Sequence, residues 1–250
     1  MSDLTSNLLG QRRARRDAGL PNLLNEVANR LVEAYGNPRL GNFRDPVKEI
    51  FYILLSARTN EQLYKRAHAS LMRRYPRIEM LANAKVAGVH RCIEGAGLGV
   101  KRARQVIGIA KRLTGDLGAT PGRGLRRMAP QEIFDYLTSL PGVGPKSALC
   151  VMMCSLDHDV FPVDVNVQRV LERIGALSKG LRHYQAQQIA PKYVPSGRSR
   201  ELHVGLVEHG RQICVPRLPK CGRCFLVDLC NHGRKVTRFN ERLQLRTSIS

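Results

Sequence analysis

Apolar residues recur at helical spacing along almost the whole chain, and this periodicity limits the fold more than any other feature of the sequence. One stripe near the start comprises Leu24, Val27, Ala28, Leu31 and Val32, and a later one comprises Val167, Val170, Leu171 and Ile174. Glycine and proline clusters separate the stripes, as at 95–97, 141–145 and 195–197. Because no run alternates apolar and polar residues as a half-buried strand does, the sequence predicts an all-α fold.

The charge of the chain points to a polyanionic partner. Lysine and arginine number 41 against 20 aspartate and glutamate residues, for a formal net charge of +21. Such a surface attracts nucleic acid, although a basic surface can also be solvated without a specific partner. The longest strongly apolar stretch, near residues 50–57, is far shorter than the ~20 residues that cross a membrane. Since residues 1–20 contain no apolar signal segment, we expect an intracellular protein of the cytoplasm or nucleoid, without membrane contact.

The most informative segment is 140–148, which reads Leu-Pro-Gly-Val-Gly-Pro-Lys-Ser-Ala. Helices are expected on both sides, over 130–137 and 145–154, with a proline in the first turn of the second. Gly142 and Gly144 permit a tight hairpin, and the N–H groups that start the second helix can bind an anion. A glycine pair between helices is often an ordinary turn. In so basic a chain, the segment predicts a helix–hairpin–helix that grips a DNA phosphate without reading sequence.

Two residues near this hairpin are candidates for catalysis. Lys146 stands in the first turn of the second expected helix, where the helix dipole disfavours a cation and favours the nucleophilic neutral amine. A simple phosphate contact explains Lys146 equally well. Asp164 precedes a helix expected over 167–174, so it can be an N-cap. As a catalytic carboxylate it would instead stabilise positive charge that develops on a sugar and help move protons.

Four of the seven cysteines crowd into residues 214–230, with six, two and five residues between them. Without a secretion signal, this crowding indicates metal binding more than disulfides. Zinc sites usually pair two Cys-x2-Cys knuckles, and this spacing has only one, which favours an iron–sulfur cluster. Arg217, Lys220 and Arg223 lie inside the loop and would place positive charge beside a phosphate. The candidate ligands are Cys214, Cys221, Cys224 and Cys230.

Together, these motifs resemble the endonuclease III family of DNA glycosylases. The resemblance rests on the hairpin at 140–148, the Val163-Asp164 pair, and His209-Gly210-Arg211 followed by the four cysteines. It extends from about Pro46 to Cys230.

The resemblance implies a two-domain architecture and a cofactor. A six-helix barrel domain is expected over 41–158, and a cluster domain over 1–40 and 159–250, on either side of a DNA-binding cleft. The four cysteines are expected to hold a [4Fe–4S] cluster in the loop 214–230. The expected partner is double-stranded DNA with a damaged base or an abasic site, bound by a monomer.

The resemblance also assigns roles to individual residues. Lys146 matches the Schiff-base lysine, and Asp164 matches the catalytic aspartate. Arg58 and Leu98 match residues that fill the space left by a flipped nucleotide. The remaining residues expected to contact DNA are Gly142, Val143, Gly144, Arg217, Lys220 and Arg223.

The function expected from the resemblance is a bifunctional glycosylase and abasic-site lyase that removes oxidised pyrimidines and cuts the strand by β-elimination. Arg58 stands where the family typically has glutamine, and Asn166 stands where histidine is common. These differences leave mismatched thymine and 5-methylcytosine open as alternative substrates. A non-catalytic DNA-binding protein is a further alternative, against which the joint presence of Lys146 and Asp164 argues.

Overall fold

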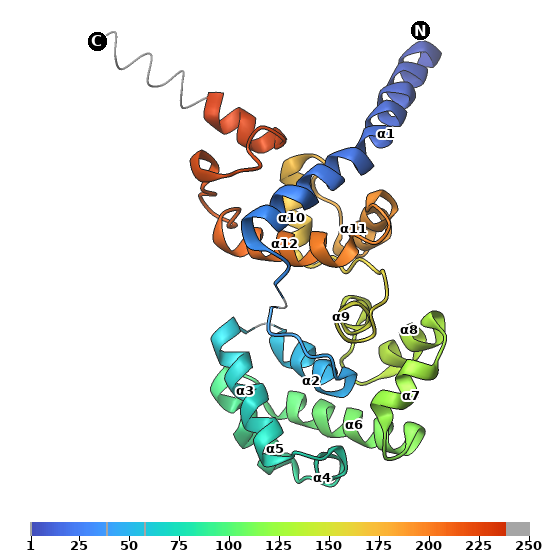
Figure 1. Ribbon diagram of the computed structural model, residues 1–250, viewed down its shortest axis with the longest axis vertical. Helices are drawn as coiled ribbons and strands as arrows, with labels where there is room; N and C mark the ends of the chain where they lie inside the picture. Colours follow the sequence, from blue (N-terminus) through green and yellow to red (C-terminus); the bar gives the residue numbers. More distant parts are fainter. Residues whose placement is uncertain (1, 39, 58, 239–250) are drawn as a thin grey trace, which may run out of the picture. The chain divides into compact units, whose positions relative to one another are not determined.

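The structure is a computed structural model of the chain, and it describes residues 2–38, 40–57 and 59–238. The chain divides into two compact units. One, the central unit, comprises residues 41–158, and the other, the terminal unit, is formed by residues up to 40 and from 159 onward. Helices are the only regular elements among the described residues, so the predicted all-α fold is confirmed (Figure 1).

The central unit consists of helices joined by short loops. Its helices are α2 (Pro46–Ser56), α3 (Glu61–Arg74), α4 (Ile78–Ala82), α5 (Val86–Ile93), η1 (Glu94–Ala96), α6 (Val100–Leu117), α7 (Pro121–Arg127), α8 (Pro130–Ser139) and α9 (Pro145–Ser155). Helix α2 packs against α3 and α9, while α6 packs against α4 and α5.

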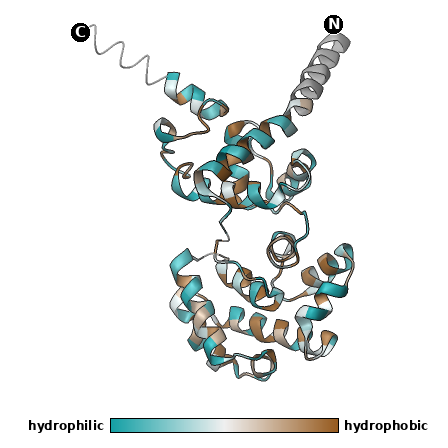
Figure 2. Ribbon diagram, viewed as in Figure 1, coloured by the Kyte–Doolittle hydropathy of each residue, from teal (hydrophilic) through white to brown (hydrophobic). Residues whose placement is uncertain are grey.

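Helix α2 provides much of the core of the central unit. Asp45 caps its N-terminus by accepting a hydrogen bond from the Val47 N–H at 2.9 Å, and Pro46 occupies the first turn. Figure 2 shows α2 in largely apolar colours, whereas α3 carries more hydrophilic ones. This contrast is expected, because a helix that is apolar on all sides is stable only when it is buried. Its most buried side chains include Ile50, Phe51, Leu54 and Leu55.

The terminal unit joins segments from opposite ends of the chain. Its helices are α1 (Ser2–Tyr35), α10 (Val165–Ile174), α11 (His183–Ile189), η2 (Ala190–Tyr193), α12 (Ser199–Gln212) and η3 (Cys221–Arg223). Helix α12 packs against both α1 and α10. Gly205 permits the close crossing with α1, since a Cβ at this position would lie 2.7 Å from the Leu31 Cβ. The shared core includes Leu24, Val27, Leu31, Val170, Leu202 and Leu206.

None of the helices in the described part of the chain combines the length and the apolar character that crossing a membrane would require.

The buried polar side chains of the central unit include one on α2 and one on α3. Glu49 is fully buried, and its carboxylate accepts hydrogen bonds from the Phe43 N–H at 2.8 Å and from the Asn42 amide. His68 is 3% exposed, and its Nε2 lies 3.1 Å from the Lys48 carbonyl oxygen. The His68 ring contacts the rings of Phe43 and Tyr52. Burial disfavours the charged imidazolium and lowers the pKa of His68 from 6.5 to about 4.

This shift predicts that the protein loses stability in mild acid. Above pH 6.5, His68 is neutral in both the folded and the unfolded chain, so its protonation does not reduce the free energy of unfolding there. As the pH falls from 6.5 towards 4, only the unfolded chain takes up the proton, which lowers the free energy of unfolding by up to about 3 kcal/mol. Denaturant unfolding measured between pH 4 and 8 should show this loss.

The variant His68→Gln should reduce the slope of stability against pH in that window, because it removes the titrating group. The matched control is His183→Gln, which removes a histidine whose ring is exposed in the folded chain. An identical slope in His68→Gln and in the unmodified protein would contradict the assignment.

Candidate functional site

The hairpin between α8 and α9 is a tight turn with both glycines at the surface. Gly142 has a φ of +80°, which glycine adopts without steric penalty. The Val143 N–H donates to the Leu140 carbonyl at 3.1 Å and closes the turn. The Val143 side chain is 7% exposed, so any phosphate contact at this residue comes from its backbone. Gly144 is the N-cap of α9 and has no side chain to accept from the first-turn N–H groups.

Helix α6 supports the hairpin, a contact that the sequence did not suggest. A Cβ on Gly142 would lie 2.4 Å from the Gln105 Nε2, so the backbone of the turn rests on the Gln105 carboxamide. The Arg102 guanidinium donates to the Gln105 Oε1 at 3.1 Å. Gly108 lies one turn later, and a Cβ there would be 3.1 Å from the Pro141 ring. The i, i+3 spacing of residues 102, 105 and 108 is the only sequence signal for this surface.

The structure places Lys146 at the second position of α9, where its side chain is half-buried. Lys146 and the hairpin therefore belong to one continuous element of the central unit. Leu98, predicted to enter the duplex, lies in the loop before α6 and is 7% exposed. Arg58, the other residue predicted to fill the gap, lies outside the described residues.

Asp164 is the N-cap of α10 in the terminal unit. Its Oδ1 accepts from the N–H groups of Asn166 and Val167, both at 2.8 Å. The Asn166 carboxamide also lies beside this carboxylate, with its Nδ2 at 3.5 Å from the Asp164 Oδ2. The contacts of Asp164 within its own helix are therefore those of an N-cap. This capping role is compatible with a catalytic role for the same carboxylate.

Two arginines on α10 hold the segment that carries the cysteines. The Arg169 side chain donates to the carbonyl oxygens of Gly210 at 2.8 Å and Cys214 at 2.9 Å. Arg173, one turn later, donates to the carbonyl oxygens of Val215 and Pro216, both at 2.8 Å. Sequence reasoning missed both residues, because an i, i+4 arginine pair is equally typical of a solvated helix face.

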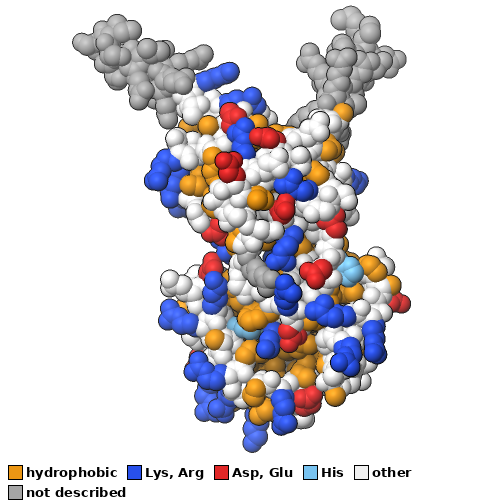
Figure 3. Space-filling model, in the orientation of Figure 1, with side chains coloured by type: hydrophobic (Ala, Val, Ile, Leu, Met, Phe, Trp, Pro, Cys, Tyr) orange, Lys and Arg blue, Asp and Glu red, His pale blue; other side chains and the backbone are white. Residues whose placement is uncertain are grey.

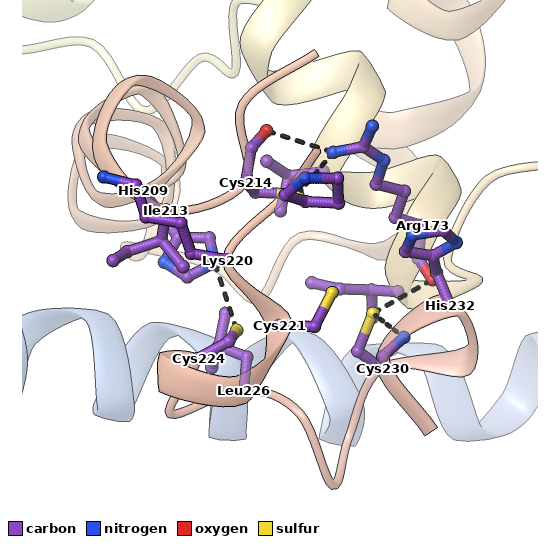
Figure 4. Close-up of a pocket in the computed structure, with 14 residues that line it drawn as sticks. Arg173, His209, Ile213, Cys214, Lys220, Cys221, Cys224, Leu226, Cys230 and His232 are labelled. Atoms are coloured by element: carbon purple, nitrogen blue, oxygen red, sulfur yellow. Dashed lines mark hydrogen bonds between the residues drawn. The ribbon is translucent and has the colours of Figure 1, made fainter. Parts of the chain in front are cut away.

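The four predicted ligand cysteines line a single cavity together with Arg173 and His209 (Figure 4). All of them are free thiols, and three are 9% exposed, while Cys224 is half-buried. Burial raises the pKa of Cys221, Cys224 and Cys230, that of Cys224 to about 11. A bound cation would reverse this effect, since metals bind the thiolate.

Three of the four sulfurs have a defined polar contact beside this cavity. The Arg173 Nη1 donates to the Cys214 Sγ at 3.2 Å, and the Gly233 N–H donates to the Cys230 Sγ at 3.3 Å. The Cys224 Sγ lies 3.5 Å from the His209 Nε2. Across the described ranges, no three His, Cys, Asp or Glu side chains are arranged closely enough to hold a metal ion. The set of four soft sulfur donors around one cavity nevertheless fits an iron–sulfur or zinc site by its chemistry.

His209, from α12, is a buried residue of this region. The sequence identified it as part of a motif but predicted no role for it. It is 1% exposed, and burial lowers its pKa to about 4. Its Nδ1 lies 3.2 Å from the Tyr35 hydroxyl, and its ring packs edge-on against Phe225. The ring thus connects α1 to the cysteine segment through neutral hydrogen bonds and aromatic contacts.

The cysteine loop carries exposed positive charge. Arg217, Lys220 and Arg223 are all exposed. In the space-filling view, lysine and arginine side chains predominate over acidic ones on the visible face of the central unit (Figure 3). This distribution is typical of a surface that binds a polyanion.

The described architecture and hairpin define a class of repair protein. The family model of the HhH-GPD superfamily of base excision DNA repair proteins matches residues 51–196. Endonuclease III of Escherichia coli (strain K12) is 30% identical over 214 residues, which cover 84% of this chain and 96% of that protein. A thymine/uracil-DNA glycosylase of Methanothermobacter thermautotrophicus is 27% identical over 197 residues, which cover 78% and 85%.

The fold agrees with these relatives. A solved non-covalent endonuclease III–DNA complex has a TM-score of 0.75 to this chain at 21% identity, and the match covers 87% of this chain and 98% of that one. The chain belongs to the endonuclease III family, as its motifs predicted. It is a DNA-binding glycosylase of base excision repair.

The hairpin geometry predicts that its two glycines tolerate substitution differently. Gly142→Ala should lower the free energy of unfolding by at least about 1–2 kcal/mol, because alanine is strained at positive φ and its Cβ would lie 2.4 Å from the Gln105 Nε2. Gly144→Ala should change it far less, since Gly144 has a φ of −98° and a Cβ there would meet no atom within 4 Å. Denaturant unfolding of both variants measures the difference, and equal losses would contradict the described turn.

Proposed function

We propose that this protein is a bifunctional DNA glycosylase and abasic-site lyase that acts, as a monomer, on oxidised pyrimidines in double-stranded DNA. The observation that carries the proposal is the position of Lys146 in the first turn of α9, directly after the hairpin, in a member of the endonuclease III family. A hairpin that binds a DNA phosphate through Gly142, Val143 and Gly144 would bring this amine to the sugar of the same strand.

The reaction begins with extrusion of the damaged nucleotide, because the anomeric carbon is unreachable inside the stack. Arg58 and Leu98 fill the vacated space; for Leu98 this requires the loop before α6 to expose a side chain that is now buried. The Lys146 amine forms a bond to C1′ while the bond to the base breaks, and the base leaves with that electron pair. Proton loss and sugar-ring opening give an imine, and removal of a C2′ proton then expels the 3′ phosphate.

The role proposed for Asp164 is electrostatic. Its carboxylate would stabilise positive charge that develops on the sugar and accept a proton from the attacking amine. The cap bonds from Asn166 and Val167 support this role, because they hold the carboxylate in one orientation.

We propose a [4Fe–4S] cluster on Cys214, Cys221, Cys224 and Cys230. Its contribution there is to organise the loop and thereby the exposed cations Arg217, Lys220 and Arg223 for contact with DNA phosphates. The cavity lined by all four cysteines and the unequal spacing of the cysteines support this assignment.

The cluster assignment predicts about four iron atoms per chain and broad absorbance near ~400 nm in the purified protein. Cys224→Ser should lower both, because it removes one ligand from the set. Cys92→Ser is the matched control, since Cys92 is a buried thiol whose Sγ contacts the Gly88 carbonyl, and it should retain the iron. Stoichiometric zinc without iron would overturn the assignment.

The proposed chemistry predicts a covalent adduct with DNA. Borohydride should trap the unmodified protein on a duplex that contains an abasic site, because the imine is reducible. Lys146→Gln should form no adduct while it still binds the duplex. Gel electrophoresis under denaturing conditions measures both the adduct and the cut strand.

Asp164→Asn is the companion variant for this assay. Asparagine is an equally good N-cap, so the fold should be preserved, while release of a damaged base should slow by about 100-fold or more. If the unmodified protein binds an abasic duplex tightly and never yields an adduct, the protein is a non-catalytic binder and the proposal fails.

A second substrate class is suggested by one relative and left open by one residue. The Methanothermobacter protein is named a thymine/uracil-DNA glycosylase, and Asn166 stands where the family commonly has histidine. Mismatched thymine or 5-methylcytosine would then be the excised base. The same cleavage assay on duplexes with thymine glycol, a G·T mismatch or 5-methylcytosine decides between them, since only the true substrate is cut at a rate that depends on Asp164.

A further inference from the structure

The cysteine loop exposes one large apolar side chain under backbone strain. Leu218 is 91% exposed, the most exposed of the large hydrophobic residues in the described chain. Its φ is +52°, a left-handed conformation that non-glycine residues adopt rarely. It also precedes Pro219, and residues before proline normally take an extended conformation. An exposed leucine in such a conformation is not explained by folding, because it buries nothing there.

The surrounding loop holds this conformation in place. The Lys220 N–H donates to the Ile213 carbonyl at 3.0 Å and closes the loop at its base. Before Leu218 in the chain, the Arg173 guanidinium donates hydrogen bonds to the carbonyl oxygens of Val215 and Pro216. Strained backbone persists only where neighbouring contacts determine it, and such positions cluster at functional sites.

The neighbours of Leu218 identify the chemistry of its partner. Arg217 and Lys220 flank it in sequence, and both are exposed. The loop therefore carries one exposed apolar side chain with an exposed cation before it and after it in sequence, and hydrogen bonds hold the loop at both ends. DNA offers the complementary pattern, since its minor groove has apolar sugar edges between two rows of phosphates.

We propose that Leu218 is an apolar DNA contact that enters the minor groove and packs against deoxyribose, while Arg217 and Lys220 bind the phosphates on either side. This inference rests on the proposed role of the cysteine loop in DNA binding. It adds a contact that depends on shape and not on charge, so its strength is independent of salt.

The test compares variants that separate strain, size and charge. Leu218→Asn keeps a similar size and suits the left-handed conformation, but it removes the apolar contact. Leu218→Met keeps the apolar contact. Arg217→Gln removes a flanking charge. Tyr184→Ala is the matched control, since Tyr184 is an exposed apolar residue elsewhere in the terminal unit, 53% exposed. Each protein is titrated with a duplex that carries a tetrahydrofuran abasic analogue, at several salt concentrations, after its metal content has been checked.

We expect Leu218→Asn to weaken binding about tenfold at every salt concentration, with an unchanged slope of log Kd against log salt. Its midpoint of denaturant unfolding should be equal to or above that of the unmodified protein, which excludes misfolding as the cause. Leu218→Met and Tyr184→Ala should bind normally. Arg217→Gln should weaken binding and reduce the salt slope by about 1.

Two different failures are distinguishable. If Leu218→Asn binds as tightly as the unmodified protein while Arg217→Gln is weakened, the loop contacts DNA and the proposed role of Leu218 is wrong. If Arg217→Gln also binds normally with an unchanged salt slope, the loop does not contact DNA, and the proposed role of the loop fails with it.

Discussion

Hydrogen bonds from two guanidinium groups of α10 hold the cysteine segment, and the organisation of the terminal unit depends on them. Arg169 and Arg173 donate to backbone carbonyls of four residues, Gly210, Cys214, Val215 and Pro216. An irregular loop leaves such carbonyls without partners of its own, and arginine satisfies several at once because its donors form a rigid fork. The same helix begins at Asp164, so one rigid element orients the proposed catalytic carboxylate and the proposed cluster ligands.

The central unit solves a similar problem with glycine. In the proposed phosphate contact, the hairpin would present backbone N–H groups to the anion, so its outer surface could not carry bulky side chains. Gly142 meets this need, and its positive φ turns the chain back against Gln105 of α6. Val143 faces inward and anchors the turn in the core, which keeps the exposed backbone in one conformation. Lys146 lies in the first turn of α9, directly after the hairpin, so the hairpin determines where the proposed nucleophile is placed.

Much of the fold was predictable because helices that pack against a core carry apolar residues at a regular spacing in the sequence. The stripe of Val167, Val170, Leu171 and Ile174 predicted a helix that the structure places at α10, with all four side chains buried. Motifs with local geometry were predictable for the same reason, as in the glycine hairpin. The roles of Arg169 and Arg173 were not predictable. The sequence does not distinguish an arginine that binds distant carbonyl groups from an arginine that is exposed to solvent. Leu218 was also missed, since neither its exposure nor its left-handed backbone follows from residue type.

The sequence by itself determined the all-α class, the hairpin with its lysine, the cysteine spacing and the family, because each depends on residues that lie close together in the chain. Only the tertiary structure decided which distant groups meet. It set Leu31 of α1 against Gly205 of α12, rested Gly142 on Gln105, and gathered four cysteines with Arg173 and His209 around one cavity. The physical reason is that these contacts depend on how helices cross and where loops close, and a one-dimensional pattern of apolar and polar residues records neither.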